Sequence, residues 1–228
     1  MGKNDNGNNG RTELVFVVDR SGSMGGLESD TIGGFNSMLS KQRTIAGECR
    51  VTTLLFDHRI ETLHNHLDIR EVNDLTSRDY WVRGSTALLD AIGLAIDRMI
   101  VTQRHTAAAY RAQHVLFVII TDGYENASRR YSLHQIKQMI TYERERYHRE
   151  FVFLGANIDA EQTAGDFGIS PRCATDFHAD GQGIKASFEA VACAATAVRG
   201  GADLEDLNAP DFLGGVRDDY RSRRRMKR

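Results

Sequence analysis

The chain has little of what would tie it to a membrane or an oxidising compartment. Its 228 residues include no apolar run long enough for a transmembrane helix and no signal-peptide core. The start also fails the myristoylation pattern, because Asn6 stands where Ser or Thr is needed. Its three cysteines, Cys49, Cys173 and Cys193, are widely spaced and read as buried, reduced thiols. We expect a cytoplasmic protein.

No internal repeat and no phosphate-binding G-x-x-x-x-G-K-[ST] motif occurs, so we expect no ATPase activity of the chain's own. The net charge of −2 conceals an asymmetry. The last eight residues, 221–228, carry six basic groups, and without them 23 basic and 31 acidic residues leave a net charge of −8. An acidic domain argues against a nucleic-acid-binding face, so only the tail Arg221–Arg228 is a candidate for binding nucleic acid or anionic lipid.

Buried-strand patterns alternate with amphipathic helix patterns along most of the chain. Four almost wholly apolar runs predict parallel strands covered on both faces, at Leu14–Val18, Val51–Phe56, Val115–Ile120 and Phe151–Leu154. The segment Arg59–His64 alternates polar and apolar residues and predicts an antiparallel edge strand.

Between the strands, apolar residues at helical spacing predict helices through Ile32–Leu39, Leu88–Met99 and Ile184–Val198. Ser132-x-x-Gln135 and Asp159-x-x-Gln162 resemble capping boxes that begin two more. The alternation predicts a doubly wound, mostly parallel α/β sheet of six strands, with one antiparallel edge strand and helices on both faces. We expect a disordered tail at 1–11, one domain at 12–200, and an arm with a basic tail at 201–228.

Three segments carry oxygen ligands to the carboxyl end of this sheet. Asp19, Ser21 and Ser23 follow the first apolar run, Thr86 opens a helix after Gly84, and Asp122 closes the strand Val115–Ile120. Oxygen-only ligands suit Mg²⁺ or Mn²⁺. Ligands of such sheets bind outside the carboxyl ends of the strands, where Asp19 and Asp122 lie. Three glycines at 22, 25 and 26 are expected to give the first loop its sharp turn.

This pattern, D-x-S-x-S followed by a distant Thr and a distant Asp, resembles the metal-ion-dependent adhesion site (MIDAS) of von Willebrand factor type A (VWA) domains, of the stand-alone microbial type. The resemblance covers roughly residues 12–200. It implies that the serines and the threonine bind the metal directly and that the aspartates act largely through water. An Asp or Glu of a partner protein would then fill the open position, and a multi-protein complex is the expected setting. Asp90 and Asn126 are candidates for supporting the ligands.

Two function classes follow from these residues. The first is a metal-dependent protein-binding module without enzymatic activity. The second is a metal-dependent hydrolase or phosphotransferase at the same site. Haloacid-dehalogenase-type enzymes use D-x-D, however, and Ser21 stands where their second Asp would transfer protons. No general base is evident for Ser21 or Ser23, so the binding module is preferred. A His or Lys within hydrogen-bond reach of either serine would favour the enzyme.

For three other segments we expect no specific functional site. His58, His64 and His66 gather at the edge hairpin, where a solvated edge is expected rather than a transition-metal site. The segment Ala202–Val216 is acidic with a few apolar residues and is expected to be a loosely ordered tail. The tail Arg221–Arg228 is expected to be disordered.

Overall fold

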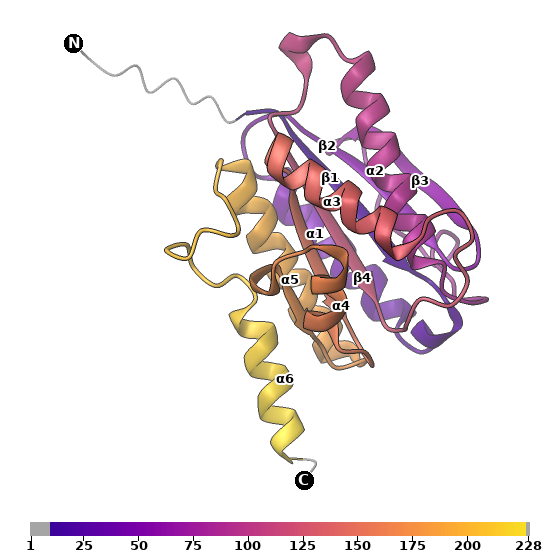
Figure 1. The fold of residues 1–228 in the computed structure, drawn as a ribbon. Helices are drawn as coiled ribbons and strands as arrows, with labels where there is room; N and C mark the ends of the chain where they lie inside the picture. Colours follow the sequence, from indigo (N-terminus) through magenta and orange to yellow (C-terminus); the bar gives the residue numbers. More distant parts are fainter. Residues whose placement is uncertain (1–9, 227–228) are drawn as a thin grey trace.

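The strands and helices of the chain follow the predicted α/β alternation in a computed structural model, which describes residues 10–226 (Figure 1). The strands are β1 (Thr12–Asp19), β2 (Cys49–Phe56), β3 (Ile60–Asp68), β4 (His114–Thr121), β5 (Glu150–Gly155) and β6 (Ala174–Asp176). The helices are α1 (Glu28–Arg43), α2 (Leu88–His105), α3 (Leu133–Tyr147), α4 (Ala160–Phe167), α5 (Gly181–Arg199) and α6 (Gly214–Met226). Short 3₁₀ turns lie at Gly22–Met24, Ala108–Tyr110 and Pro171–Cys173.

The six strands form one sheet in the order β3-β2-β1-β4-β5-β6. Every neighbouring pair is parallel except β2 and β3, which are antiparallel. The predicted fold class is therefore confirmed. Apolar runs become central strands because both of their faces are covered, and all eight residues of β1 are buried.

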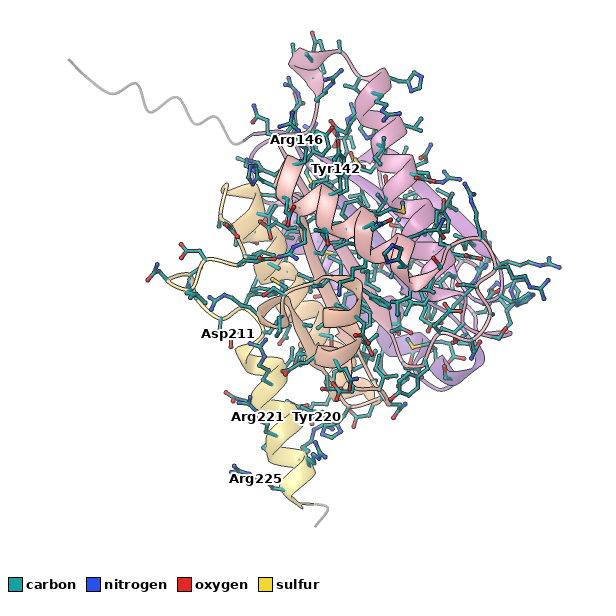
Figure 2. All side chains as sticks on the ribbon, viewed as in Figure 1. Tyr142, Arg146, Asp211, Tyr220, Arg221 and Arg225 are labelled. Atoms are coloured by element: carbon teal, nitrogen blue, oxygen red, sulfur yellow. The ribbon has the colours of Figure 1, made fainter. Side chains whose placement is uncertain are left out.

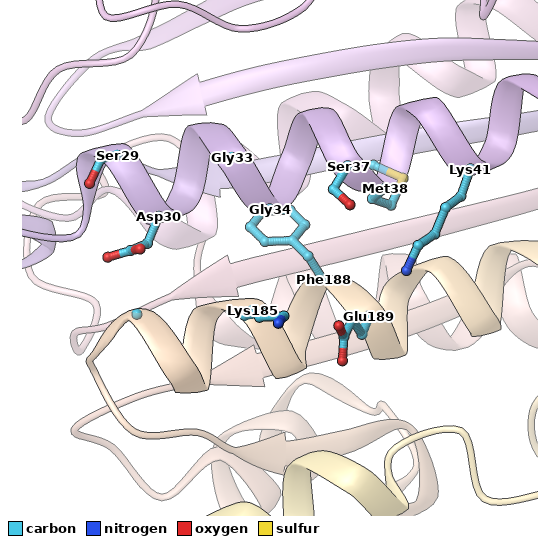
Figure 3. A pocket seen from close by; sticks show the side chains of 11 residues that line it. Ser29, Asp30, Gly33, Gly34, Ser37, Met38, Lys41, Lys185, Phe188 and Glu189 are labelled. Carbon is cyan, nitrogen blue, oxygen red and sulfur yellow. The ribbon is translucent and has the colours of Figure 1, made fainter.

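The helices pack in two sets. Helix α1 contacts α5, which in turn contacts α6, while α2 contacts α3 and α3 contacts α4. Close approach of α1 and α5 requires a glycine, since a Cβ on Gly34 would lie 2.4 Å from Cδ2 of Phe188. Figure 3 shows the shallow groove between these helices, rimmed by charges of both signs such as Asp30, Lys41 and Glu189.

The strand order reverses between β1 and β4. From β1 the chain builds outward to β2 and β3, then returns to the other side of β1 with β4. The carboxyl ends of β1 and β4 therefore lie side by side at the switch point, where α/β sheets bind their ligands. Asp19 ends β1, and Asp122 directly follows β4.

In the edge strand β3, the structure differs from the solvated edge that was expected around the histidines. A bulge between β2 and β3 shifts the register around Thr53. His64 is buried, its Nδ1 is 3.0 Å from Thr53 Oγ1, and its ring stacks on Phe35. His66 Nδ1 lies 2.6 Å from the buried Glu13 carboxylate. The expectation of a solvated edge is wrong for His64, since the bulge turns it into the core.

The segment after α5 is also more ordered than expected. Leu204, Leu213 and Val216 are buried against the domain, so the expectation of a loosely ordered tail is wrong for 202–216. These apolar side chains anchor an otherwise acidic stretch. The division into a domain at 12–200 and an arm with a basic tail at 201–228 stays a prediction.

Helix α6 follows this segment. Arg221–Met226, expected to be disordered, belong to α6, with Arg221 and Arg225 exposed (Figure 2). Arg223 pairs instead with Asp180 and Asp219. The rest of the predicted basic tail and most of the predicted N-terminal tail lie outside the described residues.

Two of the three predicted buried thiols, Cys49 and Cys173, are buried, whereas Cys193 is exposed on α5. Within residues 10–226, no helix combines the length and the apolar character required to cross a membrane.

Candidate metal centre

The loop after β1 brings Asp19, Ser21 and Ser23 together. Asp19 is fully buried, and its Oδ1 accepts a hydrogen bond of 2.6 Å from the Ser21 N–H. The 3₁₀ turn that starts at Gly22 then brings Ser23 Oγ to 3.0 Å from Ser21 Oγ. Of the three glycines in this loop, only Gly26 has a positive φ, of 87°. A Cβ on Gly22 would lie 3.3 Å from the Gly84 carbonyl oxygen and a Cβ on Gly25 3.1 Å from the Gly22 carbonyl oxygen, so close backbone approach favours glycine there as well.

Two further segments complete the cluster. Ser23 Oγ donates a hydrogen bond to Asp122 Oδ1, which joins the β1 loop to the end of β4. The Gly22 N–H donates to the Gly84 carbonyl at 3.1 Å, which joins the β1 loop to the segment that carries Thr86. A Cβ on Gly123 would lie 3.3 Å from Ser23 Oγ and 3.7 Å from Thr86 Oγ1. The three predicted segments therefore meet around one point.

Thr86 is held from the β4–α3 loop. Its N–H donates to Asn126 Oδ1 at 2.9 Å, and its carbonyl accepts from the Asn126 N–H at 3.0 Å. Thr86 lies two residues before α2 rather than at its first residue, and only 3% of it is exposed. Asn126 thus lies where a residue that supports a ligand was predicted.

Asp90 lies elsewhere. Its carboxylate accepts hydrogen bonds from the backbone N–H groups of Arg129, Arg130 and Tyr131. Within the described chain it forms no hydrogen bond to any of the five predicted ligands. The structure therefore corrects the prediction for Asp90: its carboxylate organises the β4–α3 loop, and it reaches the cluster only through that loop.

Sequence reasoning missed two residues that fix Asp19. Thr121 Oγ1 donates to Asp19 Oδ2 at 2.6 Å, and the Tyr80 hydroxyl donates to the Asp19 carbonyl at 2.5 Å. Thr121 could have been noticed, because it precedes Asp122 at the end of an apolar strand and parallel pairing brings that end beside Asp19. Tyr80 lies in a segment without regular structure, so no periodic signal identifies it.

The two carboxylates of the cluster are buried without a cationic side chain. Burial raises the pKa of Asp19 to about 6, although hydrogen bonds from Thr121 and Ser21 oppose this shift. Burial likewise raises the pKa of Asp122, and Ser23 opposes the shift. Asp122 Oδ2 is buried and has no hydrogen-bond partner among residues 10–226. Buried polar atoms are rarely left without partners. Other buried atoms, such as Arg20 Nη1, share this state, but Asp122 Oδ2 belongs to a residue where the three segments meet.

These residues fit a hard divalent cation. Two carboxylates and three hydroxyls offer oxygen ligands only, the set that Mg²⁺ and Mn²⁺ prefer. Across residues 10–226, no group of three or more His, Cys, Asp or Glu side chains could hold a metal. A site here therefore depends on the hydroxyls, as the sequence predicts.

Neither serine is hydrogen-bonded to a basic side chain within residues 10–226. In the described part of the chain, the side-chain partners of Ser21 and Ser23 are each other, Asp19 and Asp122, and neither a His nor a Lys hydrogen-bonds to them. The observation that would have favoured a serine nucleophile is not met in this region.

A second polar cluster, buried at Arg20 and Asp57, lies directly beside the first. Arg20 is fully buried between Asp19 and Ser21, with its Nε 3.1 Å from Asp57 Oδ2 and its Nη2 2.7 Å from Glu61 Oε2. Arg83 Nε also lies 2.7 Å from Asp57 Oδ2. Burial raises the pKa of Asp57, but the hydrogen bonds and charges of these arginines outweigh it, so the pKa lies below its ordinary value. We call these four residues the arginine cluster; the sequence analysis did not identify it.

Comparison with known proteins gives similar structures but no similar sequence family. No protein-family model and no curated protein sequence matches the chain. Proximal thread matrix protein 1 of the mussel byssus, solved with a zinc-occupied MIDAS motif, is 14% identical with a TM-score of 0.57. The match covers 82% of this chain and 46% of the mussel protein, so the chain spans about half the length of that protein.

The manganese-loaded TRAP protein of Plasmodium vivax is 16% identical with a TM-score of 0.52. That match covers 78% of this chain and 72% of the TRAP chain. At such identities the likeness concerns the fold alone.

Proposed function

Starting from its VWA-like fold, we propose that this chain is a protein-binding module that recognises an Asp or Glu of a partner protein through Mg²⁺ or Mn²⁺. Asp19, Ser21, Ser23, Thr86 and Asp122 would hold the cation. The observation that carries the proposal is Asp122 Oδ2, a buried carboxylate oxygen without a partner at the point where all three segments meet.

The charges of the cluster explain why an acidic partner fits. Three of the five ligands are neutral hydroxyls, and both oxygens of Asp19 already accept hydrogen bonds from Ser21 and Thr121. When bound, the cation would supply an electrophilic point that a partner's carboxylate completes. Without that point, a domain whose first 220 residues carry a net charge of −8 would repel an acidic partner.

The residues of the cluster would position ligands for the cation rather than take part in a reaction. Asp19 fixes the β1 loop through the Ser21 N–H, and Asn126 fixes Thr86 through two backbone hydrogen bonds. The fixed loops present the hydroxyls of Ser21, Ser23 and Thr86 toward one point without further ordering. We propose no enzymatic activity, since no basic side chain of the described residues is bonded to either serine.

The predictions about cellular location, type of protein, complex formation and nucleic-acid binding remain proposals. A cytoplasmic location is supported by three cysteines that are free, two of them buried. The stand-alone microbial type, a multi-protein complex and nucleic-acid binding by the tail at 221–228 rest on the sequence alone.

The experiment is capture of partner proteins from native lysate on the immobilised chain in Mg²⁺, followed by elution with EDTA. We expect a protein that elutes with EDTA and is lost with Asp19→Ala and Thr86→Ala. Thr102→Ala is the matched control, since Thr102 lies on α2 outside the cluster. Binding that persists in EDTA and in Asp19→Ala would mean that the partner uses another face.

A further inference from the structure

We call Asp19, Ser21, Ser23, Thr86 and Asp122 the metal cluster. A hollow of about 440 Å³ opens beside it, between the β4–α3 loop and α4. Gly123 lies between the hollow and the metal cluster. It lines the hollow, and a Cβ on it would lie within 4 Å of the hydroxyls of Ser23 and Thr86. The backbone of a single residue therefore separates the cluster from the hollow. A chain segment that places a side chain over the cluster would also pass the mouth of this hollow.

The walls of the hollow are apolar. Ile158 and Phe167 lie in its buried part, with 8% and 3% of their surface exposed. Tyr124 and Leu133 lie at its mouth and are 61% and 43% exposed. Large exposed apolar side chains gathered beside a polar centre mark an interaction surface. Covering Tyr124 and Leu133 would remove apolar area from water.

The polar groups of the hollow are largely used within the chain. Glu125 accepts hydrogen bonds from the backbone N–H groups of Leu89, Ala127 and Ser128. Asp159 Oδ1 caps α4 by accepting from the Gln162 N–H. The hollow therefore offers an occupant apolar surface more than hydrogen-bond partners, with Asp166 as a further acid in its lining.

We propose that this hollow binds an apolar side chain, of leucine or phenylalanine size, from the same partner segment whose Asp or Glu reaches the metal. The inference rests on the proposed function of the cluster and adds selectivity to it. An acidic residue alone would not distinguish one acidic surface from another. An apolar residue at a fixed offset from the acid would do so, because both subsites must be filled together.

The experiment selects ligands from a library of twelve-residue random peptides with one fixed central Asp or Glu. Selection is on the full chain in Mg²⁺, with elution by EDTA, and enriched peptides are then measured by fluorescence polarisation. We expect leucine, phenylalanine or similar apolar residues to be enriched at one offset from the acid. Alanine at that offset should weaken binding at least tenfold.

Variants of the protein separate the hollow from the metal. Leu133→Lys places a charge at the mouth and should weaken the selected peptides at least tenfold, without changing Mn²⁺ affinity. Leu207→Lys is the matched control, because Leu207 is 84% exposed and does not line the hollow. It should leave peptide affinity unchanged.

The outcomes distinguish the inference from the function on which it rests. EDTA-eluted peptides without an apolar preference, or with affinity insensitive to Leu133→Lys, overturn the inference and leave the metal-bridged function standing. Enrichment of Lys or Arg at the offset also overturns it and favours recognition by Asp159 and Asp166. If no peptide is eluted by EDTA, the metal-bridged function is contradicted, and the inference falls with it.

Discussion

The metal cluster and the arginine cluster are neighbouring polar groups with buried charges, and they share a loop but differ in charge balance. In the arginine cluster, Arg20 and Arg83 neutralise Asp57, and Glu61 adds a second acid. In the metal cluster, the hydrogen-bond partners of Asp19 and Asp122 within residues 10–226 are hydroxyl and N–H groups. In the same residues, Asp122 Oδ2 has no partner, nor has Arg20 Nη1 of the arginine cluster. A buried charge is stable when it is paired. This difference in charge balance is why we propose a cation for the metal cluster and a role in the fold for the arginine cluster.

The largest expected effect comes from unbalancing the arginine cluster. Asp57→Asn keeps the shape of the side chain but leaves the buried Arg20 with Glu61 alone. We expect a loss of about 3 kcal/mol in the free energy of unfolding, as for a buried pair that loses one partner. Urea denaturation at pH 7 measures it. Because the folded pKa of Asp57 is lowered, its contribution is present above about pH 4 and disappears as the pH falls through the folded pKa.

Asp68→Asn is the control for that prediction. Asp68 pairs with Arg70, which is 73% exposed, so its loss should cost less than about 1 kcal/mol. Equal effects of Asp57→Asn and Asp68→Asn would show that the arginine cluster is not structural.

An Asp→Asn substitution in the metal cluster should change the free energy of unfolding in the opposite direction. Burial raises the pKa of Asp19 from 3.8 to about 6, so its ionised form destabilises the metal-free fold. The free energy of unfolding should therefore fall as the pH rises from about 4 to about 6, by up to about 3 kcal/mol from this group. Asp19→Asn should remove that slope and be at least as stable as the unsubstituted chain at pH 7 in EDTA.

Thermal and urea unfolding of Asp19→Asn, in EDTA and in Mg²⁺, provide the measurement. Mg²⁺ should stabilise the unsubstituted chain by ligand linkage and leave the variant unchanged. A variant that is less stable than the unsubstituted chain by more than about 1 kcal/mol in EDTA would contradict the account of unpaired carboxylates.

A smaller effect is expected at Asn126, which positions Thr86. Asn126→Ala removes the acceptor for the Thr86 N–H and should cost about 1 kcal/mol of stability. It should also weaken metal binding at least tenfold, as expected for residues that orient ligands. Asn36→Ala is the matched control, because Asn36 bonds the backbone of Leu75 in the same way but lies outside the cluster. Equal metal affinity of the two variants would refute the positioning role.

The smallest effect is expected for a partly exposed ion pair, in which the Arg223 side chain is 23% exposed. Arg223 on α6 bonds Asp180 and Asp219 near the surface. Arg223→Ala should cost less than about 1 kcal/mol, and less still in 1 M salt. Chemical denaturation at two salt concentrations tests this. A cost above 2 kcal/mol would mean that α6 contributes more to the fold than its exposed charges suggest.

The strongest signals in the sequence were long apolar runs that end in a ligand. The runs that became β1 and β4 located Asp19 and Asp122, because parallel strands that are neighbours must end together. β6 has only three residues, Ala174–Asp176, and no apolar run, so a sixth strand was expected without its position being identified. The bulge that buries His64 likewise depends on pairing with β2, which no local pattern encodes.

In the candidate metal centre too, features that depend on tertiary contacts could not be predicted from local sequence patterns. The five candidate ligands were predicted from three segments that resemble a MIDAS, whereas the residues that position them come from loops without periodicity. Tyr80 and the partners of Arg20 approach only after the chain has folded. The misinterpreted segment 202–216 is similar, since a few apolar residues in an acidic stretch gain their burial from surfaces formed elsewhere.

The most direct test of the central claim is calorimetric titration of the chain with Mg²⁺ and with Mn²⁺ at pH 7, in parallel with Asp19→Asn. The account predicts one divalent site in the unsubstituted chain and none in the variant, while both remain folded by circular dichroism. No binding by the unsubstituted chain, or the same isotherm in both proteins, would contradict a metal centre at Asp19 and Asp122.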